Sequence, residues 1–192
     1  MSRGKVRIIG GNWRGRKLTV PDLAEVRPTP DRVRETLFNW LAPILPGALC
    51  LDLFAGSGAL GFEALSRGAS YAVLVDQSPV AVKLLREELI LFKADNARVY
   101  QARLPDQWPP FDKVFDIVFL DPPFQENLLL PICFALEEKA LLADTAYVYL
   151  ERGEQVQEKD LPANWQIIKS KKAGQVIYSL VKRTLKKETP HE

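Results

Sequence analysis

Hydrophobic and polar residues follow two periods along the chain. Short apolar runs alternate with stretches in which apolar residues recur every three or four positions. The runs predict strands at residues 48–54, 70–76, 97–102, 114–121 and 146–152, and the stretches predict helices at 59–67, 79–94 and 127–142. Strands that alternate with helices indicate an α/β fold with a mostly parallel, doubly wound sheet.

Both ends of the chain have the pattern of antiparallel hairpins. Residues 6–20 alternate apolar and basic positions around Gly10-Gly11, and residues 165–183 contain a turn near Ala173-Gly174. The second hairpin would add an antiparallel edge to the sheet. Residues 185–192 are expected to form a frayed tail.

A further helix is predicted after the first hairpin. Thr29 is a suitable N-cap, Pro30 suits the first helical position, and Pro43 is expected to end the helix. The apolar stripe that would face the core consists of Val33, Leu37, Trp40, Leu41 and Ile44. Arg32 and Arg34 lie off this stripe, so both are expected to be free for solvent or phosphate.

The length and composition favour one domain with a small appendage. The chain has 192 residues, of which 47% are hydrophobic and 26% charged. The expected divisions are a basic extension at residues 1–26, a main domain at 27–185 and a tail at 186–192. The sequence contains neither an apolar run that could span a membrane nor the apolar region of a signal peptide, so a cytoplasmic protein is expected.

The few cysteines and histidines narrow the possible chemistry. Cys50 and Cys133 each lie in apolar surroundings, which predicts reduced core residues rather than a disulfide or metal ligands. His191 is the only histidine and lies next to the C-terminal residue. A catalytic triad, a histidine base and a histidine metal cluster are therefore nearly excluded, and no metal is expected.

Charge is segregated along the chain, although the net charge is only +2. Residues 1–34 hold nine basic and three acidic residues, and residues 164–192 hold seven and two. The stretch between them holds ten basic and nineteen acidic residues. Basic ends of this kind suit contact with a polyanion, although they can also be solvated tails.

The N-terminal hairpin carries residue types that RNA recognition uses. Its basic residues are Arg7, Arg14, Arg16 and Lys17, with Trp13 near the tip. Guanidinium groups bind phosphate, and either a guanidinium or an exposed aromatic ring can stack on a base. The alternative is a solvated hairpin whose Trp13 packs on the core.

A glycine turn follows the first predicted strand of the sheet. Residues 56–61, GSGALG, match G-x-G-x-x-G between a strand and a helix, and Asp76 ends the next strand. The glycines permit close approach of a ligand to the backbone, and the acid suits ribose hydroxyl groups. This stretch suits a dinucleotide and S-adenosylmethionine equally, and a turn without a ligand is the third possibility.

Two features favour S-adenosylmethionine. Asp52 lies in an apolar strand, where a carboxylate is costly unless it binds something. It would hold the ammonium group of the methionine moiety and repel a pyrophosphate, although it could also brace the glycine turn. The second feature is the segment Asp121-Pro122-Pro123-Phe124, for which a nicotinamide enzyme gives no reason.

This segment ends the fourth predicted strand on a stiff backbone, because two prolines fix two φ angles. The Asp121 carboxylate and the Pro122 carbonyl could accept hydrogen bonds from an exocyclic amine and hold it in line with a methyl donor. Phe124 would stack on the base. Asp-Pro also opens ordinary turns, so the segment gains weight from its place at the same sheet edge as the glycine turn.

Four long motifs resemble a single family. DPPF is similar to the (Asp/Asn)-Pro-Pro-(Tyr/Phe) signature of methyltransferases that modify amino groups of nucleic-acid bases. Together with RIIGGNWRGRKL, RPTPDRVRETLFNWL and DLFAGSGALGFEALSRGA, it resembles the RsmD family of bacterial methyltransferases. These enzymes modify the N2 amine of a guanine in 16S ribosomal RNA. The resemblance implies a Rossmann-like class I methyltransferase fold with a seven-stranded sheet, S-adenosylmethionine as cofactor and the assembled or assembling 30S subunit as substrate; a monomer is expected.

The resemblance also implies roles for individual residues. Cofactor contacts fall on Asp52, Phe54, Ala55, Gly56, Ser57, Gly58, Asp76, Gln77, Gln101 and Ala102. Contacts with the target guanine fall on Asp121, Pro122, Pro123 and Phe124, and RNA contacts on Arg7, Trp13, Arg14, Arg16, Lys17, Arg27, Arg32 and Arg34. Many methyltransferases have an acid after the third strand for the adenine amine, whereas this chain has Gln101-Ala102-Arg103, so Gln101 or backbone groups would replace it.

Three other functions remain open from the sequence. Methylation of adenine in DNA is disfavoured because asparagine is commoner at the Asp121 position in that group, and no separate DNA-recognition domain fits. A nicotinamide oxidoreductase is disfavoured by the Asp-Pro-Pro-Phe segment and by the lack of a second domain. An RNA-binding module without catalysis is disfavoured by the intact Asp121.

Overall fold

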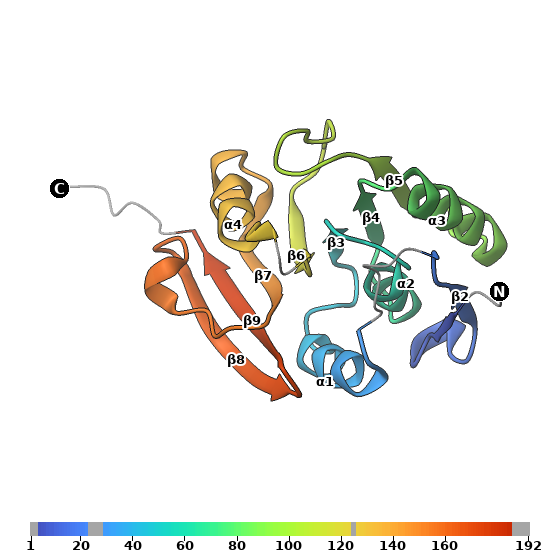
Figure 1. The fold of residues 1–192 in the computed structure, drawn as a ribbon, viewed down its shortest axis with the longest axis horizontal. Helices are drawn as coiled ribbons and strands as arrows, with labels where there is room; N and C mark the ends of the chain where they lie inside the picture. The colour runs from blue at the N-terminus through green and yellow to red at the C-terminus, as the bar shows by residue number, and fades with distance from the viewer. Residues whose placement is uncertain (1–3, 23–28, 124–125, 186–192) are drawn as a thin grey trace.

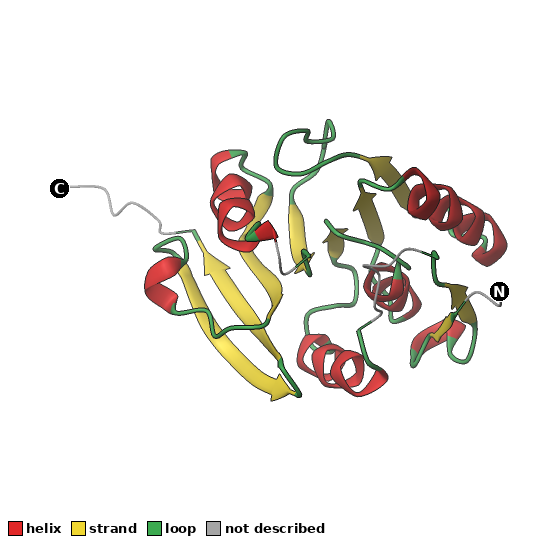
Figure 2. Ribbon diagram, viewed as in Figure 1, coloured by secondary structure: helices red, strands yellow, loops and turns green. Residues whose placement is uncertain are grey.

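A central sheet of seven strands is present in the described part of the protein, residues 4–22, 29–123 and 126–185 of a computed structural model (Figures 1 and 2). Its strands are β3 (Leu49–Asp52), β4 (Tyr71–Asp76), β5 (Ala97–Gln101), β6 (Phe115–Leu120), β7 (Leu142–Arg152), β8 (Trp165–Ala173) and β9 (Val176–Thr184). The order is β5-β4-β3-β6-β7-β9-β8; the first five strands are parallel, and β9 is antiparallel to both neighbours. The predicted sheet, including its antiparallel edge, is confirmed.

Helices cover both faces of the sheet. The helices α1 (Asp31–Leu41), α2 (Ala59–Ser66) and α3 (Pro79–Phe92) share a core with one face, and α4 (Leu129–Glu138) shares a core with the other. Neighbouring residues on a strand point to opposite faces. In β3, for example, Cys50 belongs to the first core and Leu51 to the second.

The N-terminal hairpin is fastened to α2. Its strands β1 (Lys5–Arg7) and β2 (Lys17–Thr19) are antiparallel, and the short 3-10 helix η1 (Gly11–Trp13) lies in their connection (Figure 1). Glu63 of α2 accepts hydrogen bonds from the backbone N–H groups of Ile9 and Gly10, at 2.9 and 2.8 Å. The hairpin therefore packs on the main domain, and the boundary predicted at residues 26 and 27 lies outside the described residues.

Three predictions of local structure are wrong. The helix α1 begins at Asp31 with Pro30 as N-cap, and Thr29 is buried and makes no capping hydrogen bond. The helix predicted at residues 127–142 ends at Glu138, because Ala140 takes a φ of 52° and reverses the chain. The next strand starts at Leu142, earlier than predicted, because apolar Leu142 pairs with Phe115 of β6.

Both cysteines have the predicted environment, since Cys50 and Cys133 are buried and form no disulfide. Within the described residues, no helix is long and apolar enough to cross a membrane. The same residues contain no group of three or more His, Cys, Asp or Glu side chains arranged to hold a metal ion.

Candidate active site

A cleft of about 1640 Å³ opens at the C-terminal edge of the parallel strands. Its walls come from residues 52–57 at the end of β3, residues 76–78 at the end of β4, residues 121–123 directly after β6, and Glu151 near the end of β7. The hairpin of β8 and β9 adds Lys172, Gln175 and Val176 from its turn and the adjoining strand ends. Ligands of open α/β sheets bind at this edge, because the strands all end there.

One carboxylate stands at the end of each of four neighbouring strands: Asp52, Asp76, Asp121 and Glu151. Side-chain alternation places all four on the face of the sheet that α1, α2 and α3 cover, in step with Cys50, Leu74, Phe119 and Tyr149. Within the described part of the chain, none of the four forms an ion pair with a basic side chain. The cleft is therefore strongly acidic and suits a cationic ligand better than an anionic one.

Asp52 is buried where β3 leads into the glycine turn. Its Oδ2 accepts a hydrogen bond from the backbone N–H of Gly61, in the first turn of α2, at 3.2 Å. Burial raises the pKa of Asp52 to about 7, although the Gly61 hydrogen bond opposes the shift. Asp52 thus braces the turn and still lines the cleft, as the two sequence-based interpretations together allowed.

The glycine turn has a backbone that side chains would disturb. Gly58 takes a φ of 79°, and a Cβ at this position would lie 2.6 Å from the Leu85 side chain. The N–H of Gly56 donates to Oδ2 of Asp76 at 2.8 Å, and the N–H of Ser78 donates to Oδ1 at 2.8 Å. Burial raises the pKa of Asp76, and these hydrogen bonds partly offset the rise. The turn and the acid of β4 therefore form one unit.

Asp121 and Glu151 lie next to each other across two strands. The preceding residues, Leu120 and Leu150, are paired in the parallel register of β6 and β7. Burial raises the pKa of Asp121 well above its usual range, and the charges of Glu151 and Asp52 raise it further. The Tyr149 hydroxyl donates to Oε2 of Glu151 at 2.7 Å. The two carboxylates therefore face the same part of the cleft at close range.

Comparison with known proteins identifies the family. A family model described as "Conserved hypothetical protein 95" matches residues 6–182. The "Ribosomal RNA small subunit methyltransferase D" of Escherichia coli K12 is 48% identical over 186 residues, 97% of this chain and 94% of that protein. The chain belongs to the ribosomal RNA small subunit methyltransferase D family. The Haemophilus influenzae protein of the same name is 43% identical over 93% of this chain and 94% of its own length.

The fold of this family member also matches a solved structure. The E. coli protein yhhF has a TM-score of 0.86 at 48% identity, over 95% of this chain and all of that one. The class I methyltransferase fold expected from the motifs is therefore confirmed.

Most of the predicted cofactor and base contacts of this family member come together in the cleft. Those that line it are Asp52, Phe54, Ala55, Gly56, Ser57, Asp76, Gln77, Ala102, Asp121, Pro122 and Pro123. Gly58 shapes the turn without lining the cleft. Gln101 also lies outside the lining, and its side chain donates weakly to the carbonyl of Gln77, at 3.5 Å. Phe124 lies outside the described residues.

The predicted RNA contacts of this family member divide into exposed and buried residues. Arg7, Arg14, Lys17 and Arg32 are exposed, and Arg27 lies outside the described residues. The expectation that Arg34 faces solvent is wrong, because its side chain is fully buried and bonds to the carbonyls of Thr29 and Arg7.

Trp13 and Arg16 both contact Phe92 of α3. The sequence had left open whether Trp13 is exposed or packs on the core. Trp13 is half-buried, and its ring lies 5.0 Å from that of Phe92, so it packs on the core and is not an exposed stacking platform. Arg16 is exposed, but its guanidinium lies 3.6 Å from the centre of the Phe92 ring and donates to the carbonyl of Leu91. These contacts hold the hairpin against α3.

Glu151 is the functional candidate that sequence reasoning missed. Its signal was present, because it is an acid near the C-terminal end of a predicted strand, like Asp52, Asp76 and Asp121. That Glu151 would lie beside Asp121 could not be deduced from the sequence, because the sequence does not give the order of the strands. Other lining residues without a predicted role in the site include Thr29, Leu60, Ser78, Leu104, Glu126 and Lys172.

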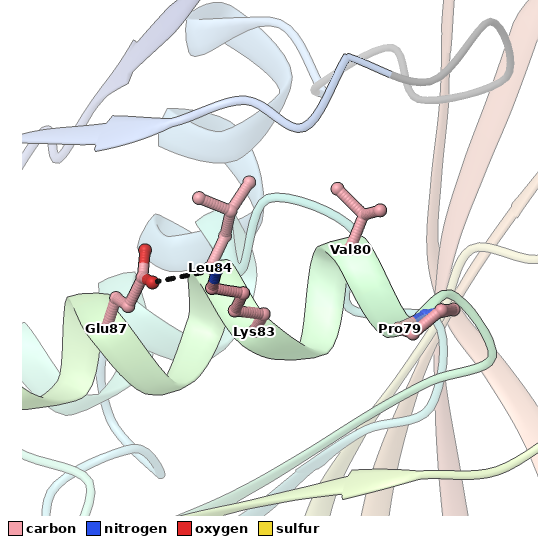
Figure 3. Close-up of a pocket in the computed structure, with 5 residues that line it drawn as sticks. All are labelled: Pro79, Val80, Lys83, Leu84 and Glu87. Carbon is pink, nitrogen blue, oxygen red and sulfur yellow. Dashed lines mark ion pairs between the residues drawn. The ribbon is translucent and has the colours of Figure 1, made fainter.

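A second hollow, of about 500 Å³, lies on α3 and shares no lining residue with the carboxylate cleft (Figure 3). Its only charged lining residues, Lys83 and Glu87, are 4.0 Å apart and belong to a solvent-exposed pair. Such a pair is typical of a helix surface. The cleft at the sheet edge is therefore the candidate active site.

Proposed function

We propose that the protein transfers a methyl group from S-adenosylmethionine to the N2 amine of a specific guanine in 16S ribosomal RNA. The single observation that carries this proposal is the common cleft of the Asp121-Pro122-Pro123 segment, the glycine turn and Asp76. Membership of the family, whose E. coli member is named for small-subunit ribosomal RNA, supports the substrate class.

The residues of the cleft fit S-adenosylmethionine. Four carboxylates without a basic partner among the described residues suit a ligand with a sulfonium, an ammonium and ribose hydroxyl groups. Asp52 would hold the ammonium group and Asp76 the ribose. A dinucleotide would bring its pyrophosphate against the same acids, which disfavours an oxidoreductase. When bound, S-adenosylmethionine supplies an electrophilic methyl group.

Asp121 and Pro122 would orient the amine that accepts this methyl group. The carboxylate and the carbonyl both accept hydrogen bonds, so they can hold the two N–H bonds of the amine and direct its lone pair away from the ring. Positive charge that develops on the nitrogen lies beside the carboxylate, which stabilises it. The nitrogen then releases one proton, so Asp121 needs no strong basicity.

The exposed basic residues of the hairpin would bind the RNA backbone. Arg7, Arg14 and Lys17 present cations outside the acidic cleft, where phosphates would be repelled. In this arrangement residues 1–26 form an RNA-binding extension and residues 27–185 the catalytic domain. The substrate would be an assembled or assembling 30S subunit, and the enzyme a cytoplasmic monomer.

A labelling experiment tests the proposal. The protein is incubated with labelled S-adenosylmethionine and small subunits from a strain that lacks the enzyme. Label is expected at one guanine of 16S RNA, and mass spectrometry of RNA fragments identifies the nucleotide and the methylated nitrogen. Label in DNA, with none in 16S RNA, would reject the proposal.

A further inference from the structure

Glu151 is the one strand-end carboxylate of the cleft to which the proposed mechanism gives no task. Asp52 and Asp76 belong to the cofactor side, and Asp121 holds the amine. Glu151 is only 6% exposed, yet it lines the cleft. A buried carboxylate without a basic partner is costly, so its retention at this position needs an explanation.

The neighbourhood of Glu151 holds its carboxylate in one place. The Tyr149 hydroxyl donates to its Oε2 at 2.7 Å, and Thr29, which also lines the cleft, lies beside it and lowers its pKa. Tyr149 is itself fully buried and packs against Phe119 and Tyr178. An ionised carboxylate can accept about four hydrogen bonds, so the bond from Tyr149 leaves acceptor capacity beside the cleft.

The register of the sheet places the free acceptor positions of the Glu151 carboxylate beside Asp121. Leu120 and Leu150 are paired, so Asp121, directly after the end of β6, and Glu151 on β7 lie side by side and point to the same face, close enough for the charge of Glu151 to raise the pKa of Asp121. Two carboxylates this close form a pair of acceptors that repel each other. A ligand with two neighbouring N–H donors would satisfy both and relieve the repulsion.

Guanine has this donor pattern on its Watson–Crick edge, where N1–H lies next to the N2 amine. Adenine presents an acceptor, N1, at the corresponding position, which a carboxylate repels. Enzymes that act on single bases read this edge with hydrogen bonds after the base leaves its stack. A site built for a donor strongly rejects an analogue that lacks it.

We propose that Glu151 is a specificity-determining residue that accepts a hydrogen bond from N1–H of the target guanine, beside the amine held by Asp121. This inference rests on the proposed function and adds the reason why the site takes guanine. It assigns Glu151 no part in methyl transfer itself.

The test exchanges donor and acceptor on both sides of this contact. The base 2-aminopurine keeps the N2 amine but has an unprotonated N1, which is an acceptor. It is placed by RNA ligation at the mapped nucleotide, and the small subunit is reassembled. In Glu151→Gln, the amide can donate to that N1, and its oxygen can still accept from Tyr149.

Wild-type protein is expected to prefer guanine over 2-aminopurine by about 100-fold or more in kcat/KM. Glu151→Gln is expected to lower this ratio at least tenfold, both by weaker use of guanine and by better use of 2-aminopurine. The matched control is Glu154→Gln, because Glu154 is 83% exposed and lies outside the cleft lining. The control should leave the ratio unchanged.

A binding measurement gives a readout that does not depend on turnover. The fluorescence of 2-aminopurine increases when the base leaves its stack, so titration with protein and S-adenosylhomocysteine reports its capture in the cleft. Glu151→Gln should capture this base more tightly than wild-type protein does. If Glu151→Gln lowers kcat/KM equally for guanine and for 2-aminopurine, the preference for guanine is unchanged. That outcome would overturn the proposal and leave Glu151 a structural role.

Two further controls separate the possible failures. If Glu151→Gln does not fold, Tyr149→Phe removes only the hydroxyl that orients the carboxylate and should lower the guanine preference in the same direction; an unchanged preference would overturn the proposal. If wild-type protein fails to methylate guanine in 16S RNA, the proposed function has failed instead.

Discussion

Each carboxylate of the cleft has a different set of donors, and this difference separates their tasks. The backbone N–H of Gly61 donates to Asp52, while Asp76 accepts from the N–H groups of Gly56 and Ser78. Within the described residues the Asp121 carboxylate accepts no hydrogen bond, and the charges of Glu151 and Asp52 add to burial in raising its pKa. It is therefore the acid whose hydrogen-bonding capacity is most available to a substrate.

Replacement of Asp121 should affect catalysis without weakening the fold. Asp121→Ala is expected to lower methyl transfer by about 100- to 1000-fold, because an acceptor beside the developing charge is lost. The melting temperature should not fall, since the change removes repulsion with Glu151 and Asp52. Calorimetry should find S-adenosylhomocysteine affinity within about twofold of wild type. A parallel loss of that affinity would place Asp121 on the cofactor side, and Asp121→Asn, which keeps one acceptor, should retain more activity.

The raised pKa of Asp52 predicts a pH dependence of cofactor binding. An ammonium group favours the ionised carboxylate, so binding lowers a pKa that is about 7 in the free protein. The affinity for S-adenosylhomocysteine should therefore rise roughly tenfold between pH 6 and pH 8. Calorimetry at several pH values measures this, and the rise should disappear in Asp52→Asn. A rise that persists in this variant would assign the titration to Asp76, Asp121 or Glu151.

The raised pKa of Asp52 also affects the stability of the ligand-free protein, which should fall with rising pH whereas the cofactor affinity should rise. The ordinary pKa of an aspartate is 3.8, and folding raises that of Asp52 to about 7. Between these two values the folded protein holds a proton that the unfolded chain has lost. The contribution of Asp52 to stability is therefore present below about pH 4 and decreases as the pH rises toward 7.

At the scale of elements, α2 connects the glycine turn to the N-terminal hairpin. Its first turn meets Asp52, and its buried Glu63 accepts from Ile9, Gly10 and Arg67. The Nη1 atom of Arg34, on α1, lies 3.5 Å from Oε2 of Glu63. This Nη1 has no hydrogen-bond partner among the described residues. One carboxylate thus holds the hairpin, α1 and α2 together.

Removal of this carboxylate should destabilise the protein strongly. Glu63→Ala removes the buried carboxylate beside Nη1 of Arg34, so that Asp31 is its one remaining acidic partner among the described residues, and leaves two backbone donors without acceptors; we expect a loss of about 3–5 kcal/mol in the free energy of unfolding. Urea denaturation measures the loss. The matched control is Glu87→Ala in the exposed pair of Figure 3, expected to cost less than about 1 kcal/mol. Similar losses in both variants would contradict the assigned role.

At the scale of the whole molecule, the positive and negative charges occupy different surfaces. The acidic cleft lies at the sheet edge, and the outward face of the hairpin carries Lys5, Arg7 and Lys17, with Arg14 in its connection. This separation would let the RNA backbone dock on the hairpin while a single base enters the cleft.

The salt dependence of RNA binding tests this arrangement. Arg14 and Lys17 are exposed and form no ion pair with a described residue, so they suit phosphate contacts. Arg14→Ala combined with Lys17→Ala should weaken binding and reduce the slope of log K against log salt by about 2. Lys159→Ala is the control, because Lys159 belongs to the short 3-10 helix η3 (Glu158–Asp160), which precedes β8, and β8 and β2 lie on opposite sides of the molecule in Figure 1. An unchanged slope in the double variant would exclude this face as the RNA contact.

The sequence by itself determined the elements and the ends at which chemistry could occur. Hydrophobic periods are local, so they located the five parallel strands. The residue types at the ends of these strands then located the glycine turn and three of the four strand-end acids. The turn at Gly174 and the burial of both cysteines were equally predictable.

Only the tertiary structure decided which of these residues meet. Arg34 lies off the apolar stripe of α1, but Glu63 on another helix draws it into the interior. Glu151 becomes a neighbour of Asp121 only because β7 pairs with β6 in a particular register. Both outcomes depend on contacts between distant segments, which the local pattern of a chain does not encode.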